Sequence, residues 1–185
     1  MSKNSVIERV FQPLYDKPCW NVSSGYGSFL TLEFGDPHLV TSDPEEARPE
    51  WSASMRKRHA RRRIHVRGKW HLWIYCCQWN VFTGDKLVGD SALESSSKRR
   101  IVRGAKELDG QKLVRVEIDP AHGGSAFTFD LGSRLETAPY DTDSDQWKLY
   151  EPSGKVFCYR ADGMYSHQRG STPPSREKYQ AFIDQ

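Results

Sequence analysis

Apolar and polar residues alternate with a period of two along most of the chain, which is typical of β-strands. Leu30, Leu32 and Phe34 fall on one face of such a segment, and the acid Glu33 falls on the other. The longest signal runs over residues 70–82, where both faces are apolar. Because a strand with two apolar faces is covered on both sides, we expect 70–82 to form one central strand.

Shorter alternating segments predict the remaining strands, at 38–41, 64–66, 112–119, 125–131, 134–137, 146–150 and 156–160. A helical spacing of apolar residues predicts helices at 5–11, 98–108 and 176–183. In the second of these, Ile101, Val102, Ala105 and Leu108 form the apolar stripe. Residues 42–55 contain prolines and carboxylates without periodicity, so they read as a connecting loop.

Two segments of nine residues resemble each other. Residues 27–35 and 124–132 both begin with Gly-Ser, alternate through a shared Thr and end with an acid, an apolar residue and Gly. Chance convergence is the alternative, since any strand with an outward acid and a terminal Gly turn shares this pattern. We favour a repeat of two related β-meander halves, approximately 19–82 and 112–160.

These patterns together predict the architecture. We expect one α+β domain over residues 1–185, predominantly antiparallel β, in which the two halves form a curved sheet or sandwich. One helix near 98–108 packs over it, and short helices lie at the termini. At 185 residues the chain can bury a core without a metal or disulfide.

Three blocks also look familiar: Gly25 to Gly35, Gly68 to Tyr75 and Phe129 to Gly132. They resemble blocks in small uncharacterised bacterial cytosolic proteins of unknown function. The resemblance implies a bacterial, cytoplasmic protein and implies no activity.

Composition further limits the kind of protein that the chain can be. Aromatic residues make up 12% of the chain although apolar residues reach only 37%, so large rings must supply much of the core. The four cysteines lie in no metal-ligand spacing, which favours reduced thiols with small-hydrophobe roles in a cytoplasm. No apolar run approaches the ~18 residues of a membrane span, and the first residues open no signal peptide.

Basic residues cluster in two places. The run 56–63 contributes Arg56, Lys57, Arg58, Arg61, Arg62 and Arg63, and the predicted helix 98–108 carries Arg99, Arg103 and Lys106 on one flank. If the clusters converge, they form a surface for an acidic protein or a nucleic acid, because neighbouring cations bind phosphates with release of counterions. A solvated charge run, balanced by acids at 43–50, is the alternative. Tyr26, between two glycines, is the candidate for an exposed binding ring.

Acidic residues give a weaker indication of a functional site than the basic clusters do. Glu33 and Asp130 occupy equivalent repeat positions, and Glu117 and Asp119 share one strand face. Either pair is what acid–base chemistry or a hard cation requires, but solvent-exposed acids that keep a sheet soluble are the favoured explanation of both. We therefore predict no catalytic residue, metal or cofactor.

Function follows by elimination from these observations. The leading hypothesis is a non-enzymatic module that binds another protein, such as a toxin-neutralising or regulatory protein. The first alternative is nucleic-acid binding through 56–63 and 98–106, and the second is a metal-dependent hydrolase or nuclease with a dispersed acidic site.

Overall fold

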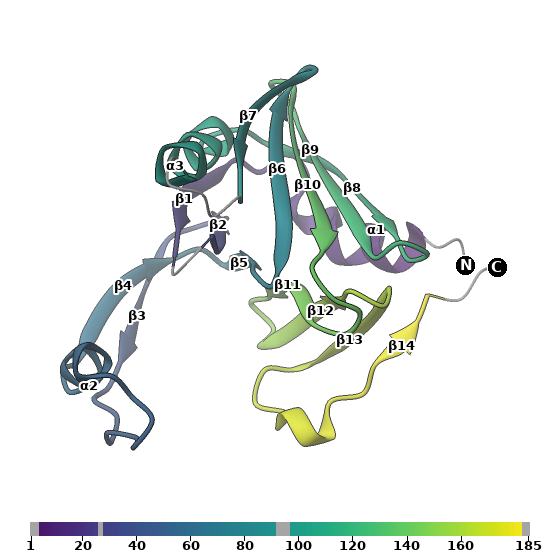
Figure 1. Ribbon diagram of the computed structural model, residues 1–185. Coiled ribbons are helices and arrows are strands. Elements are labelled where there is room, and N and C mark those ends of the chain that lie inside the picture. Colours follow the sequence, from purple (N-terminus) through teal and green to yellow (C-terminus); the bar gives the residue numbers. More distant parts are fainter. Residues whose placement is uncertain (1–3, 26–27, 92–96, 183–185) are drawn as a thin grey trace.

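Two large antiparallel sheets and one separate two-stranded ribbon form the framework of the protein (Figure 1). The structure is a computed structural model that describes residues 4–25, 28–91 and 97–182. A few short helices accompany the strands, so the predicted α+β class with predominantly antiparallel β-structure is confirmed.

The larger sheet has seven strands in the order β1-β2-β5-β11-β12-β13-β14. Their bounds are β1 Cys19–Ser24, β2 Leu30–Phe34, β5 Trp70–Ile74, β11 Asp145–Tyr150, β12 Lys155–Arg160, β13 Met164–Arg169 and β14 Gln180–Ala181. The second sheet has five strands in the order β7-β6-β10-β9-β8. Their bounds are β6 Cys77–Thr83, β7 Lys86–Asp90, β8 Leu113–Asp119, β9 Gly124–Phe129 and β10 Ser133–Pro139.

A two-stranded ribbon stands apart from both sheets. It pairs β3 His38–Ser42 with β4 Arg63–Arg67, and helix α2 Ala53–His59 lies in the connection between them. We call residues 38–67 the arm, because they project from the body of the protein (Figure 1). The other helices are α1 Asn4–Phe11, α3 Ser97–Leu108, η1 Gln12–Leu14 and η2 Pro174–Arg176.

The inner faces of the two large sheets share one hydrophobic core with α1 and α3. Trp147 of β11 lies at its centre, with edge-on contacts to Phe11 of α1 and Phe127 of β9. Its indole Nε1 donates a hydrogen bond of 2.8 Å to Ser125 Oγ, which ties the two sheets together. The expectation that aromatic rings supply the core agrees with this arrangement, since each ring buries a large apolar area.

The expected single strand over 70–82 is wrong. Its first half, β5, is central in the seven-stranded sheet, whereas its second half, β6, belongs to the five-stranded sheet. Cys76 stands between them with φ +28°, a conformation that breaks strand pairing. The break also shifts the alternation, so that Ile74 and Cys77 both point into the core.

The expected helix over 176–183 is also wrong for residues 177–182, and Ile183 lies outside the described residues. From η2 the chain runs extended into β14, which pairs with β13. Phe182 packs its ring against Tyr165 at a centroid distance of 4.4 Å, and that contact requires the extended path. Strands β7 and β13 were also missing from the sequence prediction, and β7 follows a two-residue turn with Gly84 at φ +56°.

The two segments of the predicted repeat lie in different sheets. The first contributes β2 to the seven-stranded sheet, and the second contributes β9 to the five-stranded sheet. Strands from 19–82 and from 112–160 occur together in both sheets, so the sheets do not divide along the predicted halves. A common origin of the two segments stays a prediction.

Helix α3 packs on β7 through two glycines. Ile101, Ala105 and Leu108 point into the core as predicted, whereas Val102 is 44% exposed and does not belong to the stripe. A Cβ on Gly89 of β7 would lie 2.4 Å from the Gly104 Cα, so this contact explains a glycine inside a helix.

Gly89→Ala should therefore lower the free energy of unfolding by about 2 kcal/mol, because overpacking forces the helix away from the strand. Urea denaturation followed by circular dichroism would measure it. Gly124→Ala is the matched control, since its Cβ would meet nothing closer than 3.4 Å. Equal stability of the two variants would contradict the close packing of α3 on β7.

Candidate functional site

The base of the arm is held by a buried carboxylate. Glu33 of β2 is 3% exposed, and its Oε2 accepts a hydrogen bond of 3.0 Å from the Gly68 amide. Its Oε1 lies 2.9 Å from His71 Nδ1 and 3.3 Å from Arg67 Nη1. The expectation that Glu33 is a solvent-exposed acid is therefore wrong, because the arm returns to the sheet over this side chain.

The charges in this cluster stabilise one another. Burial alone would raise the pKa of Glu33, but the hydrogen bond and charge of His71, the Gly68 amide and Arg67 together hold that pKa below its ordinary value. Arg67 Nη1 also lies 2.7 Å from His71 Nε2. Both imidazole nitrogens of His71 thus lie within hydrogen-bond distance of Arg67 Nη1, and Nδ1 also lies within hydrogen-bond distance of Glu33.

Two further contacts fix where the arm leaves and returns. Gly68 approaches the backbone of β2 so closely that a Cβ would lie 2.5 Å from the Phe34 carbonyl oxygen. On the outgoing side, the Lys69 ammonium pairs with Asp36 at 2.7 Å. The direction of the arm is thus set by the residues at its base.

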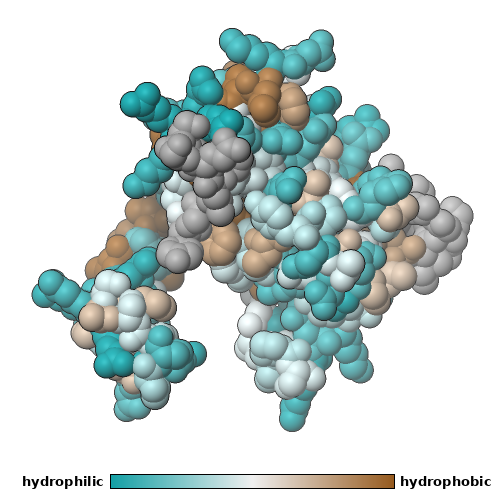
Figure 2. All heavy atoms as spheres, in the orientation of Figure 1, coloured by the Kyte–Doolittle hydropathy of each residue, from teal (hydrophilic) through white to brown (hydrophobic). Residues whose placement is uncertain are grey.

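The two faces of the ribbon differ in an unusual way. The register pairs Leu39 with Val66 and Thr41 with Ile64, which places three apolar side chains on the outer face. Leu39 is 70% exposed, Ile64 64% and Val66 44%. Figure 2 shows this hydrophobic surface along the arm, between its hydrophilic tip and the body. The inner face, which looks toward the body, carries mostly polar side chains: His38, Val40, Ser42, Arg63, His65 and Arg67.

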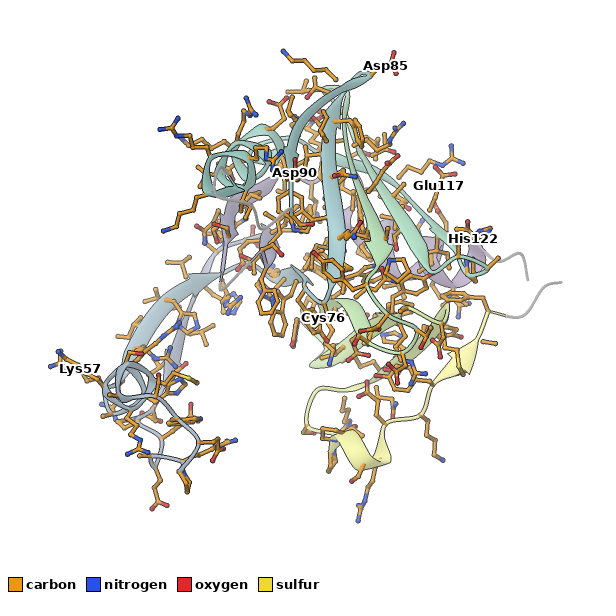
Figure 3. All side chains as sticks on the ribbon, in the orientation of Figure 1. Lys57, Cys76, Asp85, Asp90, Glu117 and His122 are labelled. Carbon is orange, nitrogen blue, oxygen red and sulfur yellow. The ribbon has the colours of Figure 1, made fainter. Side chains whose placement is uncertain are left out.

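Positive charge is concentrated on the arm. Residues 38–67 contain eight Arg or Lys and four Asp or Glu, a net charge of +4, whereas the whole chain has +3. Some of this charge is internally paired, with Arg62 at 2.8 Å from Asp43 and His59 at 3.0 Å from Glu45. Lys57 lies at the tip and points away from the body (Figure 3).

Helix α2 at the tip is anchored by local hydrogen bonds. The Ser52 hydroxyl caps its first turn by accepting from the Met55 amide. The Arg56 guanidinium donates to the carbonyls of Trp51 and Pro49, so this cation folds the loop and is not directed outward. The expected loop over 42–55 therefore ends in the first turn of a helix at Ala53.

A cleft of about 1140 Å³ separates the arm from the body. Figure 2 shows it as the hollow beside the arm. One wall is the arm, with Val40, Met55 and Arg58, and the other is the open face of the seven-stranded sheet, with Trp73 and Tyr150. The remaining lining side chains include Phe29, Pro37, His38, Arg67, Lys69, His71, Glu151 and Pro152.

The aromatic wall of the cleft is rigid. Trp73 stacks on Tyr75 with ring centroids 4.3 Å apart and planes inclined by 15°. Phe29 meets both rings edge-on, and the Tyr75 hydroxyl donates to Asp145. A ring that is packed on one side and faces the cleft on the other loses little conformational entropy when it binds a ligand.

A second hollow of about 620 Å³ lies beside the cleft. Asn21 and Ser23 of β1 line one side, and Arg63, His65 and Arg67 of β4 line the other. Thr31, Glu33, Ser42, Arg58, Ile64 and Val66 complete it. Burial and then the charges of Arg67 and Arg63 lower the pKa of His65, as expected for a base among cations.

The structure brings together only part of the predicted site. Arg58 lines both hollows and Arg63 lines the smaller one. The cluster on α3, with Arg99, Arg103 and Lys106, borders a separate shallow hollow, and α3 lies apart from α2 (Figure 1). The two basic clusters therefore do not converge. Lys57, Arg61 and Arg62 are exposed at the tip, and Tyr26 lies outside the described residues.

Sequence reasoning missed the residues that build the cleft. Arg67, Lys69 and Tyr150 were not proposed as site residues. The alternation of Glu33 and His71 on their strands was visible, but only the pairing of β2 with β5 places them opposite each other.

The acids Glu33 and Asp130 do not meet in the structure, whereas Glu117 and Asp119 both line one shallow hollow. Asp130 caps the Lys112 amide at the end of β9, in the other sheet from Glu33. Glu117 pairs with Arg115, and Asp119 pairs with His122, on the side of the protein away from Lys57 (Figure 3). Across the described ranges, no three His, Cys, Asp or Glu side chains are grouped to hold a metal ion.

None of the four cysteines forms a disulfide, and three of the four are buried. Burial raises the pKa of the Cys19 thiol to about 12, and it also raises the pKa of Cys77 and Cys158. A thiol with a raised pKa is a poor nucleophile because the thiolate is the reactive form.

The comparisons with protein-family models and with solved structures give no guide to the function of this site. No protein-family model matches the chain, and no solved structure matches it significantly. Among the helices in the described part of the chain, none has the length and apolar character that crossing a membrane requires.

Proposed function

We propose that this chain is a protein-binding module and that the arm is its docking element. The observation that carries the proposal is that the outer face of the ribbon is apolar although its three apolar side chains are 44% to 70% exposed, two of them at the rim of the smaller hollow. Two-stranded ribbons are marginal in water unless a hydrophobic face is covered. A partner protein that covers Leu39, Ile64 and Val66 would supply that burial.

Charge supports an acidic partner. The arm carries the net positive charge of the chain and projects from the body, so an acidic surface would be attracted to it first. The fixed base, with Glu33 and Gly68, presents the arm in one orientation, which reduces the entropy lost on binding.

Nucleic-acid binding is the second candidate, and the exposed cations at the arm tip favour it. Four acids on the same arm and the Asp43–Arg62 and Glu45–His59 pairs weigh against it, since they reduce the charge available to phosphates. The separation of α3 from α2 removes the continuous basic surface that this function would use.

A three-residue variant tests the proposal. The variant combines Leu39→Ser, Ile64→Ser and Val66→Ser. The tagged full chain is purified from nuclease-treated extracts of its host, and the amount of partner protein that co-purifies should fall at least tenfold. The matched control replaces Leu131, Leu87 and Val114 by Ser, because these apolar residues are 71%, 46% and 39% exposed but lie off the arm.

Two outcomes would reject the proposal. Equal retention of the partner by both triple variants would show that the apolar face of the arm is not the docking surface. Recovery of nucleic acid without any protein from untreated extracts would favour the second candidate instead, if the affinity of the chain for that nucleic acid falls steeply with salt concentration.

A further inference from the structure

The cleft and the smaller hollow form one continuous binding surface. Thr31, Arg58 and Arg67 line both of them, so a chain lying in one extends directly into the other. The two parts differ in chemistry, and this difference indicates what they would bind.

The larger part suits a bulky apolar group. Trp73, Phe29 and Tyr150 on the sheet face Val40 and Met55 on the arm. At about 1140 Å³ the cleft is larger than most small-molecule pockets, which measure roughly 300–1,000 Å³. It is open along the arm, so an extended chain can enter and leave it.

The smaller part suits an anion. Arg58, Arg63 and Arg67 supply three positive charges against one carboxylate, Glu33, which already accepts from Gly68 and His71. Arg63 Nε is buried, and within the part of the chain that the structure describes it has no hydrogen-bond partner. Buried polar groups without partners are rare, and a ligand oxygen would satisfy this one.

We infer that these joined hollows bind an extended segment of the partner protein in which a large apolar side chain neighbours an acidic one. The apolar group occupies the space between Trp73 and the arm, and the carboxylate reaches Arg58 and Arg63. This inference rests on the proposed function and assigns it a recognition sequence: an acidic residue within a few positions of an aromatic or large aliphatic one.

Peptide display tests the recognition sequence directly. Random 12-residue peptides on phage would be selected against the immobilised full chain at low ionic strength. The expected result is enrichment of peptides that combine Asp or Glu with Phe, Trp, Tyr, Leu or Met. Failure to enrich any peptide, or enrichment of neutral or basic peptides, would overturn the inference.

Binding of a synthetic peptide with the most enriched sequence would then locate the site. Arg58→Glu should weaken its Kd at least tenfold, whereas Arg99→Glu, the same charge change on exposed α3, should leave it within twofold. An equal change in Kd for both variants would mean that peptide binding depends only on the net charge of the protein, which would overturn the inference. Competition by a mixed-sequence oligonucleotide at equal affinity would also overturn the inference, because it assigns the hollows to nucleic acid.

The two proposals can fail separately. Suppose that the triple variant of the outer face loses the partner, but no peptide that combines acidic and large apolar residues is enriched. The arm then docks a protein, and the hollows do not bind a segment of that protein. If neither experiment succeeds, both proposals fall.

Discussion

Trp147→Ala should lower the free energy of unfolding by about 4 kcal/mol, the range for a fully buried aromatic side chain. The indole is completely buried between the two sheets, where it contacts Phe11 and Phe127 edge-on and stacks on Tyr159 at 5.3 Å. Truncation removes these contacts and leaves the Ser125 hydroxyl without its donor. Urea denaturation followed by circular dichroism measures the change without relying on tryptophan emission.

Two controls make the result specific to the sheet-to-sheet contact. Trp147→Phe keeps an apolar ring but loses the hydrogen bond, so it should cost about 2 kcal/mol. Leu131→Ala, at an exposed turn, should stay within about 0.5 kcal/mol of the parent. A loss of only about 0.5 kcal/mol for Trp147→Ala, as expected for a surface change, would contradict the position of this ring in the core.

Glu33→Gln should lower the free energy of unfolding by about 3 kcal/mol at neutral pH, because it removes one partner from a buried charged cluster. The amide keeps the shape of the side chain but leaves Arg67 without its counter-charge. Glu136→Gln is the matched control, since Glu136 pairs with exposed Arg134 and such pairs contribute little. Similar losses for the two variants would show that Glu33 does not anchor the arm.

The pH dependence of stability gives an independent measurement. The pKa of Glu33 in the folded protein lies below its ordinary value, so its contribution is fully present above about pH 4.5 and is lost as the pH falls through the folded pKa. The parent should therefore lose more stability than Glu33→Gln between pH 5 and about pH 3. Parallel curves for the two proteins would contradict a charged, stabilising carboxylate.

The alternating pattern located most strands, because a half-buried strand must place apolar residues at every second position. The prediction for 70–82 overlooked a shift in the alternation. The buried residues are even-numbered up to Ile74 and odd-numbered from Cys77 to Val81, and this shift is visible in the sequence. The C-terminal error has another cause. Residues 176–182 have helical spacing, but the pairing of β14 with β13 and the burial of Phe182 outweigh that local preference.

The candidate site was harder to predict because it depends on which strands become neighbours. Arg58 and Arg63 were found through the density of positive charge in the sequence. Glu33 was assigned to solvent because nothing local shows that residues 67–68 return over it. The close approach of Gly68 to β2 requires a glycine. A glycine in a sequence does not identify such a contact, because glycines also occur in turns and loops.

The uneven distribution of charge has a consequence for how the molecule would meet an acidic partner of the kind proposed above. With +4 on residues 38–67 and +3 on the whole chain, the remainder carries −1, so the protein is an electric dipole with its positive pole at the arm. In the field of an acidic surface such a dipole rotates before contact, and most productive encounters begin with the arm leading. Dissolved ions shorten the range of that torque, so salt should slow association more than it speeds release.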